Sequence, residues 1–187
     1  MFERFTKDAR EVVLGAVAHA ERAGLRSIGA EQLLLALLDR EGSRASFAFA
    51  ALGLAERKDS LRAALAEARR RAGLTRADTD ALAGLGIDVT EIVSRVEEAH
   101  GAGALSGDRR DPGGWSGRRT FDQDAKGVLE GALRAAVGHR DRRIGDEHLL
   151  LALTVRPGVP AEVLADHGVT DESLRRVLYG EGAAQAG

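Results

Sequence analysis

Two glutamates stand at matching places in two similar stretches of the sequence, and they are the first candidates for binding chemistry. Glu31 and Glu147 each follow an Ile-Gly-X triplet and precede a run of apolar residues. This places each carboxylate in the first turn of a predicted helix, where the helix dipole stabilises a negative charge by about 0.3–1 kcal/mol without any ligand. A carboxylate there can also accept two parallel N–H groups of a guanidinium. Both interpretations stay open.

A second set of candidates combines aromatic and basic side chains: Phe2, Arg10, Phe121 and Lys126. Arg10 and Lys126 are matching positions of the two stretches, and so are Phe5 and Phe121. One interpretation is a surface that contacts a partner. The other is that the phenylalanines anchor the core while the two cations are solvated; for the phenylalanines at 5 and 121 this second interpretation is favoured.

Catalytic and metal chemistry have no support in the sequence. There is no cysteine, so neither a disulfide nor a thiolate metal site can form. The five histidines lack the i, i+4 pairing and the nearby carboxylates of a metal site, and His148 is expected to pack or cap within its repeat. The phosphate loop Gly-x-x-x-x-Gly-Lys-Ser/Thr does not occur. We therefore expect no cofactor, no metal and no enzymatic activity.

Charge and hydropathy exclude two further classes of partner. The 27 basic and 29 acidic residues leave a formal charge of −2, so no general attraction to nucleic acid is expected. The basic run 69–71 ends a predicted helix and is interpreted as a solvated helix C-terminus. No signal peptide begins the sequence and no apolar run approaches the roughly 20 residues of a membrane span. We expect a cytoplasmic protein without membrane contact.

These candidates are positioned by an internal repeat. Residues 5–38 align without a gap on residues 121–154, at an offset of 116, and sixteen of the 34 pairs are identical. Chance likeness between alanine-rich helices would not reproduce the Ile-Gly-X-Glu junction in register. With small shifts the similarity continues beyond residue 38, so each copy is predicted to have four helices.

Hydrophobic periodicity predicts helices throughout. Apolar residues recur every three or four positions from residue 5 to 20, with Thr6 as a helix cap and Gly24 as its end. A second, buried helix is predicted over 31–38 and again after 147, with Asp122 and Asp146 as caps in the second copy. No strand is expected within 5–38 or 121–154, so the fold class is all-α.

The chain divides into five segments. Residues 1–73 form the first repeat and 120–180 the second. Between them, 74–100 is predicted to be helical with a turn near residue 85, and the glycine-rich segment 101–119 to be a flexible linker. The tail 181–187 is expected to fray.

The two Ile-Gly-X-Glu junctions and the apolar runs after them resemble the Clp N-terminal repeat, and the opening 1–6 is similar to the start of actinobacterial ClpC-type chaperones. The similar segments cover roughly two thirds of the chain. The resemblance implies two four-helix repeats related by a pseudo-two-fold axis, in a domain that receives substrates and adaptors. Because no phosphate loop is present, the chain is interpreted as a free-standing form of this domain, and the repeats are farther apart than is usual in the family.

The resemblance also implies roles for the candidate residues. Glutamates that match Glu31 and Glu147 bind the guanidinium of phosphoarginine in ClpC-type domains, and the region of Phe2, Arg10, Phe121 and Lys126 contacts adaptors and cyclic peptides. The threonine that usually precedes the glutamate is replaced by alanine and by Asp146.

The leading hypothesis is a non-catalytic module that binds substrates, adaptors or the Clp unfoldase and modulates proteolysis. The alternatives are a decoy for peptide ligands of the chaperone and an enzyme whose site the sequence does not reveal.

Overall fold

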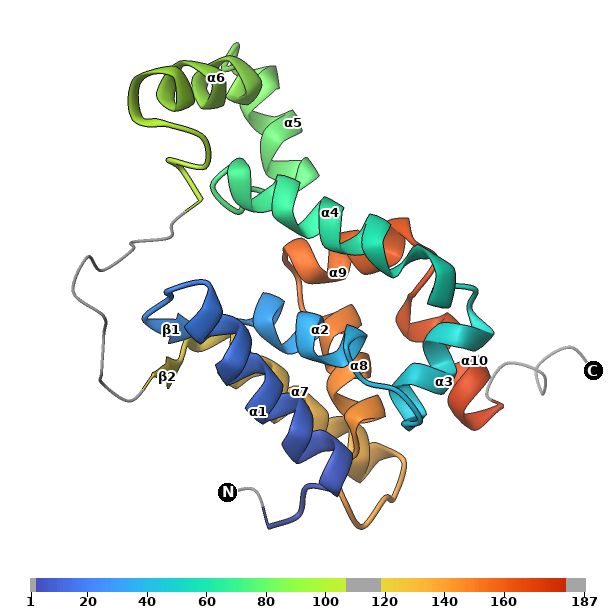
Figure 1. Ribbon diagram of the computed structural model, residues 1–187. Coiled ribbons are helices and arrows are strands. Elements are labelled where there is room, and N and C mark those ends of the chain that lie inside the picture. The colour runs from blue at the N-terminus through green and yellow to red at the C-terminus, as the bar shows by residue number, and fades with distance from the viewer. Residues whose placement is uncertain (1–2, 107–118, 181–187) are drawn as a thin grey trace, which may run out of the picture.

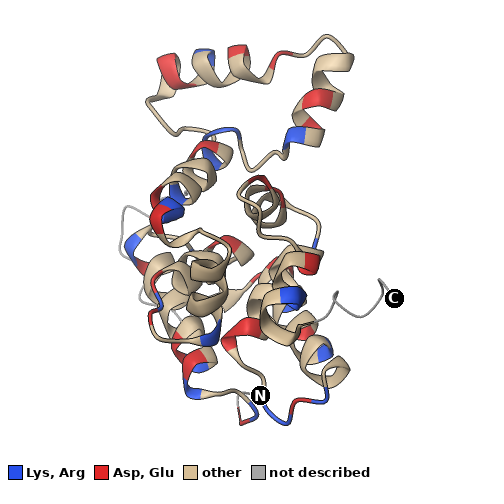
Figure 2. Ribbon diagram, turned by 90° about the vertical axis from the view of Figure 1, so that its right-hand side faces the viewer, with Lys and Arg blue, Asp and Glu red and all other residues tan. Residues whose placement is uncertain are grey.

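Ten α-helices and two very short strands make up the computed structural model, which describes residues 3–106 and 119–180 (Figure 1). The all-α class predicted from the periodicity is confirmed. No helix in these residues is both long and apolar enough to cross a membrane. Acidic and basic residues are interleaved over the body, as a nearly balanced charge would suggest (Figure 2).

The first repeat begins where a side chain replaces a missing helical hydrogen bond. The hydroxyl of Thr6 accepts the N–H of Ala9 at 3.2 Å and caps α1. Gly24, with φ of +68°, allows the chain to turn sharply after the helix. The helices of this repeat are α1 (Lys7–Arg22), α2 (Ala30–Leu38), α3 (Arg44–Ala51) and α4 (Lys58–Arg70), with a 3₁₀ turn at Ala55–Arg57.

The second repeat has the same four helices. Asp122 caps the first of them by accepting the N–H of Ala125 at 2.8 Å, as expected. The expectation that Asp146 caps the next helix is wrong, because Gly145 holds the cap position and Asp146 is the first helical residue. The helices are α7 (Gln123–Gly138), α8 (Asp146–Val155), α9 (Val159–Asp166) and α10 (Asp171–Tyr179).

The expectation that the repeats contain no strand is wrong at their contact with each other. Strand β1 (Ser27–Ile28) pairs in parallel with β2 (Thr120–Phe121), and an isolated bridge joins Phe5 to Ile144. The short segments that lead into the helices are extended there, and their buried backbone groups need partners. Phe5 and Ile28 of the first repeat match Phe121 and Ile144 of the second, so each pairing is the repeat-related copy of the other. The two pairings mark the pseudo-two-fold axis.

The repeats share one core and interlock. Helices α2 and α8 lie at its centre and contribute fully buried leucines, and α1 and α7 cover their own repeat's buried helix. The later helices cross over: α4 packs against α9, and α10 packs against α3. Each repeat therefore completes the other. The largest buried side chains of the two central helices are Leu33, Leu34, Leu37, Leu38, Leu149, Leu150 and Leu151.

The segment between the repeats is helical up to residue 100, as predicted, and projects from the body (Figure 1). It forms α5 (Arg76–Gly84) and α6 (Val89–His100). Arg70 of α4 holds α6 by donating to the Glu97 carboxylate at 3.1 and 2.7 Å. The predicted linker lies largely in 107–118, and this part and the predicted tail lie outside the described residues.

Candidate functional site

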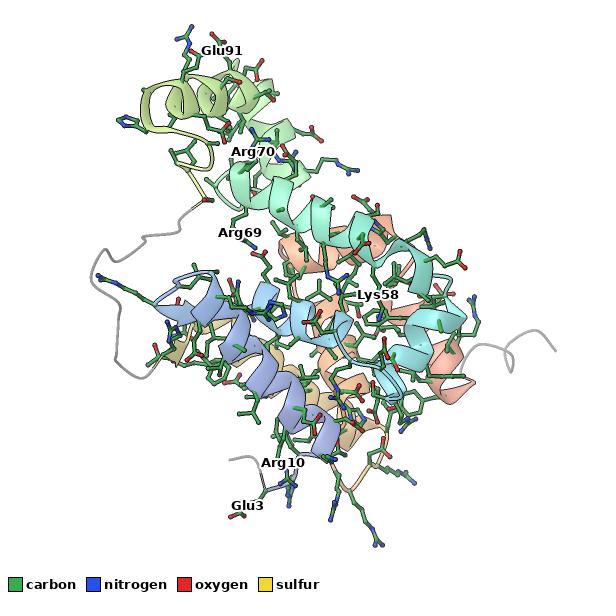
Figure 3. All side chains as sticks on the ribbon, in the orientation of Figure 1. Glu3, Arg10, Lys58, Arg69, Arg70 and Glu91 are labelled. Atoms are coloured by element: carbon green, nitrogen blue, oxygen red, sulfur yellow. The ribbon has the colours of Figure 1, made fainter. Side chains whose placement is uncertain are left out.

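Glu31 lies in the first turn of α2, where it holds a guanidinium of its own chain. Arg69 of α4 donates from Nε to the Glu31 carboxylate at 3.3 Å, and its Nη2 contacts the other oxygen. The Glu31 side chain is 22% exposed and that of Arg69 is 27% exposed. Figure 3 shows Arg69 extending from α4 toward α2. This carboxylate therefore accepts a forked guanidinium beside solvent, which corrects the interpretation of residue 69 as merely solvated.

A pocket of about 570 Å³ opens beside this ion pair, and we call it the Glu31 pocket. Its walls come from the α1–α2 junction, the end of α4, the start of α5, the first turns of α7 and the α8–α9 connection. The inserted segment therefore supplies one side of the pocket. Arg26 and Arg156 line it as well, and Arg156 pairs with Asp124 at 2.7 Å. The pocket thus combines a guanidinium acceptor with a lining of mixed charge, in which Asp78, Asp122 and Asp124 stand beside the two arginines.

Glu147, at the matching position of α8, lies in a different environment. It is only 4% exposed and accepts a hydrogen bond from Nη1 of Arg44 at 2.9 Å. Burial raises the pKa of Glu147 to about 7, although Arg44 acts in the opposite direction and neighbouring Asp146 reinforces the rise. Asp146 is itself buried and accepts the N–H of Ala45, at the start of α3, at 3.3 Å.

The pocket beside Glu147 is the pseudo-two-fold counterpart of the Glu31 pocket. Thr6 and Arg142 line it at the places that Asp122 and Arg26 take in the other repeat. Its volume is smaller, about 330 Å³, and Arg44 lies in its wall. The two glutamates are therefore equivalent in position but not in access.

Next to Glu147 lies a polar cluster that the sequence did not predict. His148 is buried, accepts the N–H of Gly145 on Nδ1 at 2.9 Å, and lies 3.0 Å from both Asp141 and the Tyr179 hydroxyl through Nε2. The expected capping role of His148 is confirmed, but the expectation that no histidine has a carboxylate neighbour is wrong. Burial lowers the pKa of His148.

The same cluster is the place to test for a metal. Ligand atoms of Asp141, Glu147 and His148 lie within 4.8 Å of one another. Nδ1 of His148 is occupied by the Gly145 N–H, and Glu147 is engaged by Arg44. These contacts hold three helices together, because Tyr179 connects α10 to His148 of α8 and Arg44 connects α3 to Glu147 of α8.

The second candidate set is spread over the start of each repeat. Arg10 is exposed and donates to the Phe5 carbonyl at 3.3 and 3.1 Å. Phe121 is half-buried in β2, and Lys126 is exposed one turn farther along α7. Phe5 and Phe121 lie at opposite ends of α1, since they pair with Ile144 and Ile28. Phe2 lies outside the described residues.

Sequence reasoning missed the arginines that bind the two glutamates. Arg44 is 103 residues from Glu147, and Arg69 is 38 residues from Glu31. Neither arginine has a matched basic residue that the repeat alignment could have revealed. Only the crossing of α3 and α4 over the other helices brings them to the glutamates.

Comparison with known proteins shows that the chain is similar to the N-terminal part of Clp chaperones. Residues 120–186 match the family model of the Clp repeat (R) N-terminal domain. An ATP-dependent Clp protease ATP-binding subunit ClpA homolog of Cyanidium caldarium is 32% identical over 176 residues, which are 94% of this chain and 16% of that protein. Chloroplastic chaperone protein ClpC1 of Arabidopsis thaliana is 31% identical over 178 residues, 94% of this chain and 14% of that protein. The chain thus spans only about one seventh of the length of these curated relatives.

Solved structures agree on the fold. The N-terminal domain of the chaperone ClpD from Arabidopsis thaliana superposes with a TM-score of 0.51 at 18% identity, covering 95% of this chain and 94% of that one. The Hsp104 N-terminal domain of Candida albicans gives a TM-score of 0.51 at 15% identity, covering 94% and 89%. At these identities the likeness concerns the arrangement of helices alone.

Proposed function

Because this chain belongs to the family of Clp repeat N-terminal domains, we propose that it is a non-catalytic module that binds polypeptide segments for Clp-dependent unfolding and proteolysis. Its partners in this proposal are substrate proteins, adaptors or the Clp unfoldase itself. The chemistry of the described residues supports binding over catalysis, since the candidate glutamates hold guanidinium groups and face no activated nucleophile. A decoy that sequesters the same ligands would use the same surfaces.

The Glu31 pocket is the proposed ligand site, and one observation carries the proposal. A guanidinium, that of Arg69, already occupies the Glu31 carboxylate at the edge of an open pocket. An incoming arginine side chain would replace it with the same fork geometry. If that arginine were phosphorylated, Arg26 and Arg156 are the cations of the pocket that could accept its phosphate, in competition with Asp122 and Asp124. Phosphoarginine is therefore the ligand we propose first, with unmodified arginine as its competitor.

The Glu147 pocket is proposed to serve the fold. Its carboxylate is buried and held by Arg44, and the buried Asp146 beside it would repel a phosphate. The module would therefore have one working guanidinium site instead of two.

Calorimetric titration of phosphoarginine and of arginine tests the proposal. Glu31→Gln removes the charged acceptor and should weaken binding tenfold or more, which corresponds to the roughly 1.5–3 kcal/mol of a charge-assisted hydrogen bond. Arg69→Ala should instead tighten binding, because the ligand no longer competes with an internal guanidinium. Glu147→Gln is the matched control and should leave the affinity unchanged.

The two variants at the same ion pair make the result unambiguous. A structural role alone would give Glu31→Gln and Arg69→Ala the same sign. Failure of the wild type to bind either compound at millimolar concentration would remove the Glu31 pocket as a guanidinium site.

For adaptors we propose two equivalent contacts instead of one surface, with Arg10 at the start of the first repeat, where Phe2 precedes the described residues, and with Phe121 and Lys126 at the start of the second. The exposure of Arg10 and Lys126 at equivalent places of the two repeats supports this proposal. Arg10→Ala and Lys126→Ala should weaken adaptor capture without affecting the titration above.

A further inference from the structure

The outer face of the second repeat carries a groove that is distinct from the Glu31 pocket, although Arg156 lines both. It runs between α7, α8 and the start of α10 and has a volume of about 460 Å³. Gly127, Gly131 and Gly138 line it along α7, and Val155 of α8 is 57% exposed in it. From Gly127 to Gly138 the groove follows three turns of helix, roughly 16 Å at the usual rise per residue.

The first repeat shows what the same face looks like when it is filled. There the Arg40 guanidinium contacts Glu11 and, at 2.6 Å, Asp8, while Nε2 of His19 lies 2.7 Å from Asp39. At the matching positions, 116 residues later, the second repeat keeps the arginine as Arg156 and the aspartate at position 8 as Asp124. Four other polar side chains of the first repeat are replaced. The replacements are Gly127 for Glu11, Ala135 for His19, Gly138 for Arg22 and Val155 for Asp39.

Packing within the repeat explains two of the three glycines, because the Arg156 guanidinium lies across Gly127 and leaves no room for a Cβ there. A Cβ on Gly131 would lie 2.9 Å from the Ala152 side chain, and Gly15 makes the same approach to Ala36 in the first repeat. Gly138 has no atom within 4 Å of such a Cβ and ends α7 in an ordinary helical conformation. Gly138 is therefore the glycine that packing leaves unexplained, and it keeps this end of the groove open where the first repeat has Arg22.

The rim of the groove is basic. Arg134 is exposed and forms no ion pair within 3–106 and 119–180. Arg175 donates to Asp171 at 2.8 Å and lies 3.1 Å from His139, and Arg156 lies across Gly127. Three arginines thus surround the groove, and since Asp124 pairs with Arg156 and Asp171 with Arg175, Arg134 gives the rim its net positive charge. This charge favours an acidic partner.

We propose that this groove docks an acidic amphipathic helix of a partner protein. The partner's aliphatic side chains would lie against the exposed Val155 and over Gly138, where no side chain fills the groove. Its carboxylates would pair with Arg134 and Arg175. This is the helix-in-groove mode of recognition, in which apolar anchors recur at spacings of three and four residues.

The test uses a fluorescein-labelled 15-residue peptide with leucine at positions 4, 7, 8 and 11 and glutamate or alanine elsewhere. Fluorescence anisotropy with the full chain should show saturable binding below millimolar concentration, and a peptide with lysine for glutamate should bind at least tenfold more weakly. Gly138→Arg restores the side chain of the first repeat and should weaken binding tenfold or more. The same variant should unfold at an unchanged or higher urea concentration, since it removes a helical glycine and adds a cation at a helix C-terminus.

A matched pair of substitutions locates the site. Val155→Asp and Leu14→Asp each place a carboxylate at an exposed apolar position, and Leu14 is 66% exposed on the first repeat, outside the groove. Only Val155→Asp should weaken binding of the acidic peptide.

Three results would overturn the proposal. They are the absence of binding to the wild type, equal binding by Gly138→Arg, and self-association of the wild type in analytical ultracentrifugation that Gly138→Arg abolishes. The last result would assign the groove to a second copy of the chain.

Discussion

At the scale of single residues, position in the repeat does not decide what a residue does. Glu31 and Glu147 both follow an Ile-Gly-X triplet and take the same place in the first helical turn. One is partly exposed beside an open pocket and the other is buried beneath Arg44. The contrast arises because Asp146 and Arg44 have no counterpart around Glu31, where Ala30 takes the place of the aspartate.

The buried carboxylate predicts a dependence of stability on pH. The pKa of Glu147, about 7, lies above its ordinary value of 4.5, so between these limits the folded chain holds a proton that the unfolded chain has released. The stabilising contribution is thus complete below about pH 4.5 and is lost as the pH rises through 7. Glu147→Gln removes the charge and should raise the free energy of unfolding by about 1–3 kcal/mol at pH 8, with little change at pH 4.5.

Urea unfolding followed by circular dichroism at the two pH values measures this effect. Arg44 is half exposed and can be solvated when its partner is gone, so its loss of pairing should cost little. The exposed Glu130→Gln is the control. A lower stability of Glu147→Gln at pH 8 would contradict the prediction and would mean that the ion pair outweighs the burial of charge.

At the scale of elements, the two buried helices begin with the same device made from different side chains. Gln32 of α2 accepts the N–H of Gly29 at 2.9 Å, and His148 of α8 accepts that of Gly145 at the same distance. Each bond satisfies a backbone donor that the helix itself leaves free. His148 adds contacts with Asp141 and Tyr179 that Gln32 lacks.

This equivalence predicts an order of stabilities. His148→Gln retains an acceptor for Gly145 and should lose less stability than His148→Ala, which leaves buried polar groups without partners and should cost about 1–3 kcal/mol. Thermal and urea unfolding at pH 8, where histidine is neutral in both states, compare the two variants. Equal losses would show that the cap contributes little and that the contacts with Asp141 and Tyr179 dominate.

At the scale of the whole molecule, the repeats are not independent folding units. The strand pairing of β1 with β2 and the bridge between Phe5 and Ile144 each join one repeat to the other. In addition, the last helix of each repeat packs on the third helix of the other. Residues of both repeats belong to one hydrophobic core. Separating them would expose the apolar faces of α3 and α4.

An isolated fragment of residues 1–73 should therefore lack a cooperative fold. Without α8, α9 and α10 it loses the surfaces against which α2, α4 and α3 pack, and a domain of this size has little stability to spare. Circular dichroism and urea unfolding of the fragment, with the full chain as reference, measure this. A sharp unfolding transition in the fragment would contradict the prediction.

The sequence by itself determined the helices and their duplication. Apolar spacing of three and four residues, the hydroxyl of Thr6, the carboxylate of Asp122 and the left-handed Gly24 all act within a few residues, so a local pattern suffices to predict them. The same locality explains one error: Asp146 resembles a cap by type, but its carboxylate turns to Ala45 of the other repeat.

Only the tertiary structure decided which partners the candidate residues have. The pairing of Glu31 with Arg69, the burial of Glu147 under Arg44 and the strand contact of Ile28 with Phe121 join residues 38, 103 and 93 positions apart. An arginine in a sequence rich in both charges has many possible partners, and the choice follows from how the repeats cross. The open groove of the second repeat has the same origin, since four small or apolar residues form a surface only when three helices bring them together.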